Sequence, residues 1–237
     1  MFVVIFVFTS KIKLNQKPYT MRKIFTLFAA VLLISAVQAQ TNVPEKFTTG
    51  IDIFNDIVLD EPDGVEFRGF NPGVNIYGMY NYPIPNSRLS LAIGLGLGMH
   101  NLHSNAALMD TSNVSFFTPY ADGVDYKINK LQLTYVDIPA EFRFKSEKGF
   151  RFAIGVKAGF MLSAHTKYKG DNPAGGRDIK IKEGKLPNLE NWRYGPTVQI
   201  GYKWINFMGF YSLSTIFDET AGPAIYPVSF GIALRPF

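Results

Sequence analysis

The chain has 237 residues, of which 47% are hydrophobic, 15% aromatic and 18% charged. That length fits one domain with processed ends rather than two cores, and 21 Gly beside 21 Phe and 12 Tyr favour strands and turns over a helical bundle. The absence of Cys excludes a disulfide framework and a thiolate metal site.

The formal net charge of +5 does not describe the mature protein. Five of the 24 basic residues and none of the 19 acidic residues precede residue 40, which leaves 19 of each after it. A neutral chain lacks the basic surface on which nucleic-acid binding depends. The composition therefore gives no support for a nucleic-acid partner.

The N-terminal part has the pattern of an export signal. Met21 is followed by Arg22 and Lys23, then by the apolar run Ile24–Ile34, and a small residue, Ala39, stands at the expected cleavage site. The apolar run is shorter than the roughly 20 residues that a membrane-spanning helix needs. We therefore expect a cleaved signal peptide rather than a membrane anchor.

Four segments follow from this pattern. Residues 1–20 are predicted to be an upstream extension, because we expect translation to start at Met21, and residues 21–39 are the signal peptide. Residues 40–46 form a short periplasmic segment, and residues 47–237 form the folded domain.

After residue 40, apolar side chains alternate with polar or small ones in eight stretches. The clearest is Leu89–Met99, where every second residue is Leu, Ile or Met and the residues between are Ser, Ala or Gly. Such alternation over about ten residues is typical of strands that face lipid on one side and a lumen on the other. We therefore predict an all-β fold, an eight-stranded antiparallel up-and-down transmembrane β-barrel. In chain order, the predicted strands are Phe47–Leu59, Phe70–Tyr82, Leu89–Met99, Lys127–Lys145, Phe150–Leu162, Trp192–Trp204, Phe207–Phe217 and Tyr226–Phe237.

The predicted connections alternate between short turns and long loops, as they do in outer-membrane barrels. An even strand count places both chain ends on the side of the short turns, the periplasm. The short connections are Pro83–Arg88, Ser146–Gly149 and Ile205–Asn206. The long ones are Asp60–Glu66, His103–Tyr126, Tyr168–Asn191 and Asp218–Ile225.

The stretch Lys127–Lys145 changes the phase of its apolar residues. Leu131, Leu133 and Tyr135 occupy odd positions, whereas the apolar residues from Val136 onward occupy even ones. Because a shift of one residue exchanges the two faces of a strand, this predicts a β-bulge near Tyr135–Asp137. Pro139 cannot donate a ladder hydrogen bond, which fits locally broken pairing there.

The segment Tyr135-Val136-Asp137-Ile138-Pro139-Ala140-Glu141-Phe142-Arg143-Phe144 resembles a stretch of the PorT-like outer-membrane β-barrel family. Lys157-Ala158-Gly159 and the terminal Phe237 add to the resemblance, although Phe237 lies on the opposite parity from Leu234. The resemblance implies an eight-stranded barrel in the outer membrane of a gram-negative bacterium. The namesake takes part in protein secretion, but most members have no assigned activity, so secretion is not carried over.

The charged residues on the predicted lumen face form the first candidate site. Eight strands leave an interior that side chains just fill, and unpaired charges there are costly. We therefore expect an ion-paired polar plug, with a narrow proton or ion path as the alternative. The predicted set is Asp137, Glu141, Arg143, Arg151, Lys157, Arg193, Lys203 and Arg235.

A second candidate is a lipid-modifying site, since some small outer-membrane barrels use His with Ser to hydrolyse or transfer acyl chains. His165 and Ser163 share a strand face, and His100, His103 and Ser104 lie near the same outer rim. No orienting acid stands at a recognisable spacing. We therefore expect no enzymatic activity and no cofactor.

Two groups of loop residues could bind ions. The acidic residues match no calcium-loop spacing, so no metal site is predicted; they are Asp110, Asp122, Asp125, Asp171 and Asp178. The basic residues Lys180, Lys182 and Lys185 could contact lipopolysaccharide phosphates, or simply form a hydrated loop.

The sequence favours a non-enzymatic barrel that supports envelope integrity or binds through the loops His103–Tyr126 and Tyr168–Asn191. The alternatives are an accessory role in secretion, a narrow transporter, a lipid-modifying enzyme and a soluble ligand-binding barrel. Expected partners are outer-membrane lipids and lipopolysaccharide, the barrel-assembly machinery during insertion, and an envelope protein of unknown identity.

Overall fold

The computed structural model describes residues 46–237, apart from residues 112, 122, 173–177, 185 and 236–237. The upstream extension, the signal peptide, its cleavage site and Phe237 lie outside the described residues. All the secondary-structure elements assigned among the described residues are β-strands. None of the described residues belongs to a helix with the length and apolar composition that crossing a membrane requires.

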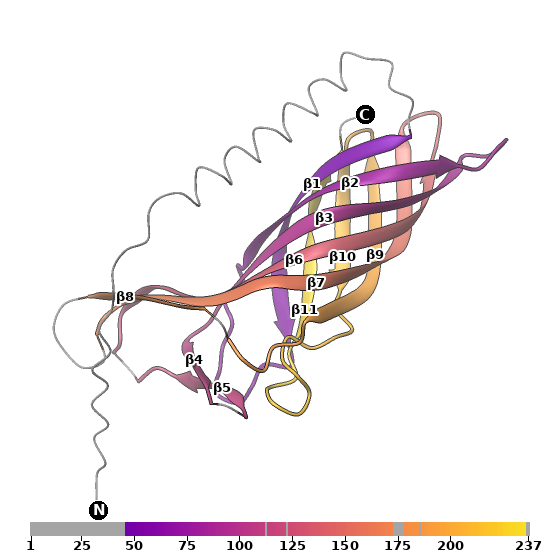
Figure 1. Ribbon diagram of the computed structural model, residues 1–237. Helices are drawn as coiled ribbons and strands as arrows, with labels where there is room; N and C mark the ends of the chain where they lie inside the picture. Colours follow the sequence, from indigo (N-terminus) through magenta and orange to yellow (C-terminus); the bar gives the residue numbers. More distant parts are fainter. Residues whose placement is uncertain (1–45, 112, 122, 173–177, 185, 236–237) are drawn as a thin grey trace, which may run out of the picture. The chain divides into compact units, whose positions relative to one another are not determined.

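Eight strands close into an antiparallel barrel, which confirms the predicted fold class (Figure 1). Each pairs with its neighbours in chain order, and β11 pairs with β1, for example at Ile53 and Ile232, to close the cylinder. These strands are β1 (Phe47–Leu59), β2 (Pro72–Pro83), β3 (Leu89–His103), β6 (Tyr126–Lys145), β7 (Phe150–Gly170), β9 (Trp192–Tyr202), β10 (Ile205–Tyr211) and β11 (Tyr226–Leu234).

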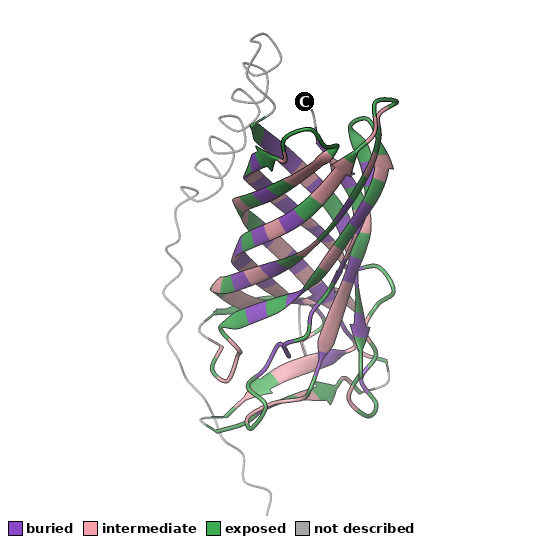
Figure 2. Ribbon diagram, turned by 90° about the vertical axis from the view of Figure 1, so that its right-hand side faces the viewer, coloured by how far each residue is buried: buried purple, intermediate pink, exposed green. Residues whose placement is uncertain are grey.

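The barrel wall is apolar outside and polar or small inside. Figure 2 shows buried and exposed residues alternating along the strands. On β3, Leu91, Ile93 and Leu95 are exposed while Ala92 between them is buried. Exposed apolar side chains of this density would destabilise a barrel in water, whereas lipid solvates them. The alternation predicted from the sequence is therefore the division between lipid and lumen.

Aromatic side chains mark both borders of the apolar band. Trp192 and Tyr194 are exposed at one end of β9, and Tyr202 and Trp204 are exposed at its other end and in the following turn. Trp and Tyr gather at membrane interfaces because their rings are apolar and their polar edges reach water. The 11 residues of β9 match the about 9–11 residues that a tilted strand needs for one crossing of the bilayer.

The connections alternate between short and long as predicted, and the long ones carry additional strands. The hairpin of β4 (Ala106–Asp110) and β5 (Ser115–Pro119) lies in the β3–β6 loop. The strand β8 (Ile179–Gly184) lies in the β7–β9 loop and pairs with the end of β7. All three gather at one end of the barrel (Figure 1); we call this end external.

The predicted strand Phe207–Phe217 is too long, and its preceding turn is misplaced. β10 runs from Ile205 to Tyr211, so the turn is formed by Lys203 and Trp204 instead of Ile205–Asn206. Lys203 has a positive φ of 52°, as a two-residue hairpin turn requires. Beyond Tyr211 the chain folds over the external mouth of the barrel, because its apolar residues pack there rather than against lipid.

An apolar cluster fills that external mouth. Phe217 is completely buried, and its ring meets that of Phe117 edge to face, with centroids 5.8 Å apart. The buried members come from β1, β3, β6 and the β10–β11 loop, so the cluster joins opposite walls. They are Val58, Leu102, Leu131, Leu133, Tyr135, Ile216, Phe217 and Ile225.

The β-bulge predicted near Tyr135–Asp137 is confirmed in its place by a register shift at Tyr135, but β6 does not change face there. Odd-numbered residues of β6 point inward along its whole central part, from Leu131 to Glu141, without a change of face. The inward residues change from polar to apolar because the lumen gives way to the cluster. At this register shift the extra residue lies on the neighbouring strand: Thr134 pairs with Ser163 and Tyr135 with Met161.

Candidate functional site

The lumen contains two carboxylates of β1 that are absent from the predicted set. Asp52 and Asp56 on β1 are 3% and 0% exposed and point inward. The alternation of β1 does place both acids on the lumen face, because they occupy even positions and Ile51, Ile53 and Ile57 occupy odd ones. The irregular composition of that strand hid its parity.

One part of the network centres on Arg193 and Asp137. Arg193 Nη2 donates to Asp137 Oδ2 at 2.8 Å and to Oδ1 at 2.9 Å, and the guanidinium lies 3.9 Å from the centre of the Tyr135 ring. Lys157 Nζ approaches Asp137 Oδ2 at 3.9 Å. Arg193 also contacts His100, so its charge is shared between a carboxylate, an aromatic face and an imidazole.

The same chain of contacts continues to the seam of the barrel. His100 Nδ1 lies 2.7 Å from Asp56 Oδ2, and Ser229 Oγ on β11 donates to Asp56 Oδ1 at 2.6 Å. This joins the first and last strands through side chains as well as through the ladder. Asp56 thus has partners from two other strands while lying completely buried.

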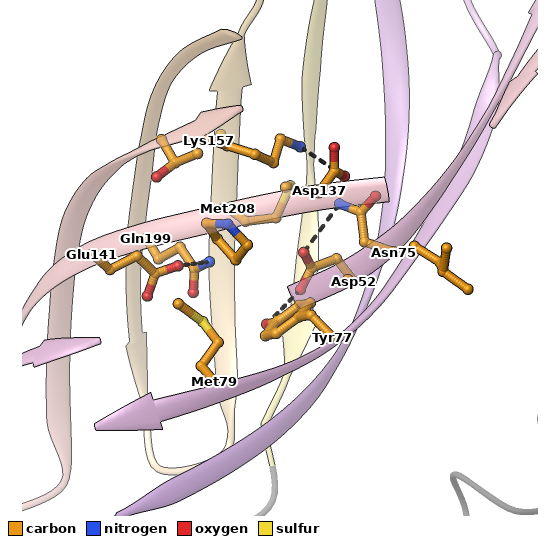
Figure 3. Close-up of a pocket in the computed structure, with 14 residues that line it drawn as sticks. Asp52, Asn75, Tyr77, Met79, Asp137, Glu141, Lys157, Gln199 and Met208 are labelled. Carbon is orange, nitrogen blue, oxygen red and sulfur yellow. Dashed lines mark hydrogen bonds and ion pairs between the residues drawn. The ribbon is translucent and has the colours of Figure 1, made fainter. Parts of the chain in front are cut away.

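The other part of the network centres on Glu141. Arg235 donates to Glu141 Oε1 at 3.0 Å and Oε2 at 3.1 Å, and Arg143 Nε donates to Oε2 at 2.7 Å. Arg235 Nε also donates to the Tyr77 hydroxyl at 2.7 Å, and that hydroxyl donates to Asp52 Oδ1 at 2.9 Å. Figure 3 shows Glu141, Tyr77 and Asp52 converging from different strands.

Six of the eight predicted lumen residues lie together in this network: Asp137, Glu141, Arg143, Lys157, Arg193 and Arg235. Lys203 does not, because the strand ends before it and the side chain is exposed in the β9–β10 turn. Arg151 is half-buried at the end of β7 that carries the short turns. With Asp52 and Asp56, four carboxylates face four cations, Arg143, Lys157, Arg193 and Arg235.

Glycines provide the space for these side chains. A Cβ on Gly98 would lie 2.8 Å from both Asp137 Oδ2 and Arg193 Nη2, and a Cβ on Gly159 would lie 2.9 Å from Arg193 Nε. These distances are shorter than van der Waals contact. The small residues that the sequence places on the lumen face therefore make room for the charged ones.

Two small cavities lie among the side chains of the lumen. A cavity of about 30 Å³ is lined by residues that include Asp52, Tyr77 and Gln199 (Figure 3). Another of about 10 Å³ lies nearer the apolar cluster, beside His100 and Arg193. Volumes of this size hold one or two water molecules. The described residues thus form a wall whose lumen is filled by its own side chains.

Among the residues considered for lipid modification, Ser163 and His165 stay together on the outward face of β7, opposite Thr134 and Gln132 of β6. His100 and Ser104 lie apart from them. His100 lies in the lumen network, and Ser104 is buried and donates to the Ala106 carbonyl. His165 lies beyond the membrane-crossing part of β7, where burial and then Lys182, Lys130 and Lys167 lower its pKa. The charged residues that lower the pKa of His165 are lysines, which do not orient a catalytic base as an acid does. The prediction of no enzymatic activity stays a prediction.

The loop carboxylates make local contacts. Asp110 accepts a hydrogen bond from Ser115, and Asp171 Oδ2 accepts one from the Asp125 amide at 3.0 Å. Asp178 is exposed, and Asp122 lies outside the described residues. In the described part of the chain, no group of three or more His, Cys, Asp or Glu side chains is placed to hold a metal ion.

The basic loop residues lie on β8. Lys180 and Lys182 are exposed and point to the same face as Lys169 and Lys167 of β7, with which they pair. Lys185 lies outside the described residues. The alternation of the sequence does not predict this clustering of cations on one face, because it indicates a loop without a strand for residues 168–191.

Comparison with known proteins places these features in a family. A family model described as outer membrane protein beta-barrel domain matches residues 38–218. The comparison with curated proteins found no similar sequence.

Among solved structures, Ail, the attachment invasion locus protein of Yersinia pestis, is similar over 81% of this chain and 97% of its own. Its complex with the heparin analogue sucrose octasulfate shows 13% identity and a TM-score of 0.39, and a second Ail structure shows 12% and 0.39. An engineered protein studied for asymmetric conductivity shows 11% identity and a TM-score of 0.21 over 80% of this chain and 98% of its own.

Proposed function

Because the chain belongs to the outer membrane protein β-barrel domain family, we propose that it is a non-conducting outer-membrane barrel that acts through its external face. The observation that carries this proposal is the filled lumen. Inside, the cations Arg143, Lys157, Arg193 and Arg235 pair with Glu141 and Asp137, and Asp52 and Asp56 accept hydrogen bonds from Tyr77 and Ser229. The apolar cluster caps the external mouth. A solute path would need open volume beyond the cavities of about 30 and 10 Å³.

The external loops supply a structured surface for binding. In the β4–β5 hairpin, Met109 and Phe116 pair directly across the strands and are 49% and 45% exposed. Adjacent exposed apolar side chains are a feature of interaction surfaces. This supports a binding role for the loop 103–126, whereas the accessory role in secretion and the PorT-like relationship stay predictions.

Planar-bilayer recording tests the closed lumen. We expect the reconstituted full chain to give a flat current trace across a range of voltages, beside a reconstituted porin as the positive control. A stable, reproducible unit conductance would overturn the proposal and favour the narrow transporter.

A complementation series tests the external face. In cells lacking the gene, any detergent-sensitivity phenotype should be restored by the wild type and by Arg143→Gln, which alters the lumen. A chain whose hairpin residues 107–118 are replaced by a short Gly-Ser turn should not restore it. Complementation by the hairpin replacement but not by Arg143→Gln would place the function in the lumen. Heat-modifiable migration verifies that each variant folds.

The lipid-modifying alternative has its own test. We expect His165→Ala and Ser163→Ala to leave lipid A acylation unchanged by mass spectrometry, because the charges around His165 are cations. A change in acylation that both variants abolish would establish catalysis at this position instead.

A further inference from the structure

Two strands are longer than a membrane crossing requires. β6 has 20 residues and β7 has 21, whereas a tilted transmembrane strand needs about 9–11. The outward apolar residues of β6 lie between Val136 and Phe144, and those of β7 between Phe150 and Leu162. Residues 126–135 and 163–170 therefore stand beyond the lipid, on the external side.

Four basic side chains line up across this extension. His103 on β3 pairs with Lys130 on β6, Lys130 pairs with Lys167 on β7, and Lys167 pairs with Lys182 on β8. Directly opposite residues in an antiparallel sheet point to the same face, with Cβ atoms about 4.5–5.5 Å apart. We call these four residues the cation row, in which the three lysines carry the positive charge and His103 stands beside them. Lys169 and Lys180 form a second pair beside it.

The cation row faces outward, over the membrane. Lys130 has the same parity on β6 as the lipid-facing Ile138, and the opposite parity to the buried Leu131 and Leu133. Lys167 alternates with the buried Tyr168 on β7. The row therefore points sideways from the barrel wall rather than up into the external medium.

Among the described residues the row has a neutral partner but no carboxylate in a salt bridge: Lys130 Nζ donates to Asn101 Oδ1 at 2.7 Å, which leaves the lysine charge in place. Like charges placed directly opposite destabilise a sheet, and the salt bridges found among the described residues include none to Lys130, Lys167 or Lys182. Burial and Lys167 lower the pKa of Lys130, and burial, Lys130 and Arg68 lower the pKa of His103. The nearest acid in sequence, Glu183, pairs with Thr166 on the other face.

We propose that the cation row binds the phosphate groups of phosphorylated glycolipids in the outer leaflet around the barrel. Its residues lie four to six positions beyond Met99, Val136 and Leu162 on their strands. At about 3.3 Å per residue and a tilt of about 45°, this is about 9–14 Å above the apolar band. Sugar-borne phosphates stand at this height, and lysine stems bend toward the membrane to reach them.

The positive charge of the cation row and its sideways orientation favour a phosphorylated lipid over other anions. A soluble partner approaching from the external medium meets the loops first, whereas the row on the side wall lies beside the headgroups of the lipids that surround the barrel. Bound phosphates would relieve the repulsion within the row, so the lipid would also rigidify the β6–β7–β8 extension. This inference needs the membrane placement of the barrel but not its closed lumen.

The experiment compares two triple variants of the full chain. The row variant carries Lys130→Gln, Lys167→Gln and Lys182→Gln. The control variant carries the same substitution at three exposed lysines, which lie before β1 and in short turns on the opposite side of the membrane: Lys46, Lys148 and Lys203. Each is reconstituted into phosphatidylcholine vesicles alone, with diphosphoryl lipid A, or with dephosphorylated lipid A. A further sample receives inorganic phosphate.

Unfolding midpoints are read by heat-modifiable migration. We expect diphosphoryl lipid A to raise Tm of the wild type and the control variant, and the row variant to lose most of that shift. Dephosphorylated lipid A and inorganic phosphate should give little or no shift. An equal shift with the dephosphorylated lipid, or an equal loss in both triple variants, would overturn the proposal, and a shift with phosphate alone would assign the row to a free anion.

A second readout guards against a folding defect. In phosphatidylcholine alone, the row variant should be at least as stable as the wild type, because the substitutions remove repulsion. A lower Tm there would show that the lysines serve the fold and would overturn the proposal. Bilayer conductance plays no part in this series, so its outcome is distinguishable from that of the closed-lumen proposal.

Discussion

The contact between Arg193 and Asp137 gives the sharpest test of the lumen network. Replacing Arg193 with Met keeps most of the side-chain volume but removes the charge. Asp137 is then left with Lys157 at 3.9 Å as its remaining ionic partner in the network. An uncompensated buried charge costs about 3–5 kcal/mol, and Asp137→Asn should cost a similar amount because it strands the guanidinium.

The double variant Arg193→Met/Asp137→Asn separates pairing from packing. It removes both charges, so its cost should fall short of the sum of the single variants by at least about 2 kcal/mol. The exposed pair Arg88 and Glu147, at 2.5 Å, is the matched control. Its side chains are 56% and 81% exposed, so Arg88→Met should cost at most about 1 kcal/mol.

Urea unfolding of the barrel in phospholipid vesicles measures these free energies. Trp192 and Trp204 are 55% and 52% exposed on the lipid-facing wall, and they are the only two tryptophans in the chain. Their fluorescence therefore reports transfer from lipid to water on unfolding. Single-variant costs below about 1 kcal/mol, or strictly additive costs in the double variant, would refute the reasoning.

Three further substitutions test the wall, the lumen and the external cluster by the same unfolding measurement. Leu95→Arg, at a lipid-facing position 63% exposed, should cost about 2–4 kcal/mol, and a cost below 1 would contradict the lipid assignment. Gly98→Ala should cost about 1–3 kcal/mol, whereas Gly69→Ala, where a Cβ meets nothing within 4 Å, should be nearly neutral. Phe217→Ala should cost about 3–5 kcal/mol and speed protease cleavage within residues 212–225 while the barrel keeps its heat-modifiable migration; unchanged cleavage would show that the cluster does not hold this segment.

The fold was predictable because lipid and lumen impose opposite demands on neighbouring residues. In Leu89–Met99 every second residue suits lipid and every residue between suits the lumen, and β3 begins at Leu89, where this alternation begins. The errors arose where the lumen stops being polar. On β6, Leu133 and Tyr135 point inward like Asp137, but they enter the apolar cluster, so a change of chemistry was interpreted as a change of face.

The candidate site was predictable in part for the same reason. The alternation of faces identified Arg193 and Glu141, whose strands alternate clearly. It missed Asp52, because β1 carries polar residues on both faces, such as Thr48 and Thr49. Partners could not be predicted at all, since contacts such as that between Arg235 and Glu141 join residues 94 positions apart. Nor does a single sequence reveal the cation row, because register across four strands decides which lysines are neighbours.

The seam of the barrel has a kinetic consequence. Ser229 and Arg235 come from the last segment of the chain, and they complete the partners of Asp56 and Glu141. Before that segment docks, moving these carboxylates into the bilayer would leave them without Ser229 and Arg235 as partners. An intermediate that has inserted seven strands would be held at the membrane surface, where water still reaches its interior, and the final hairpin would commit the protein to the bilayer.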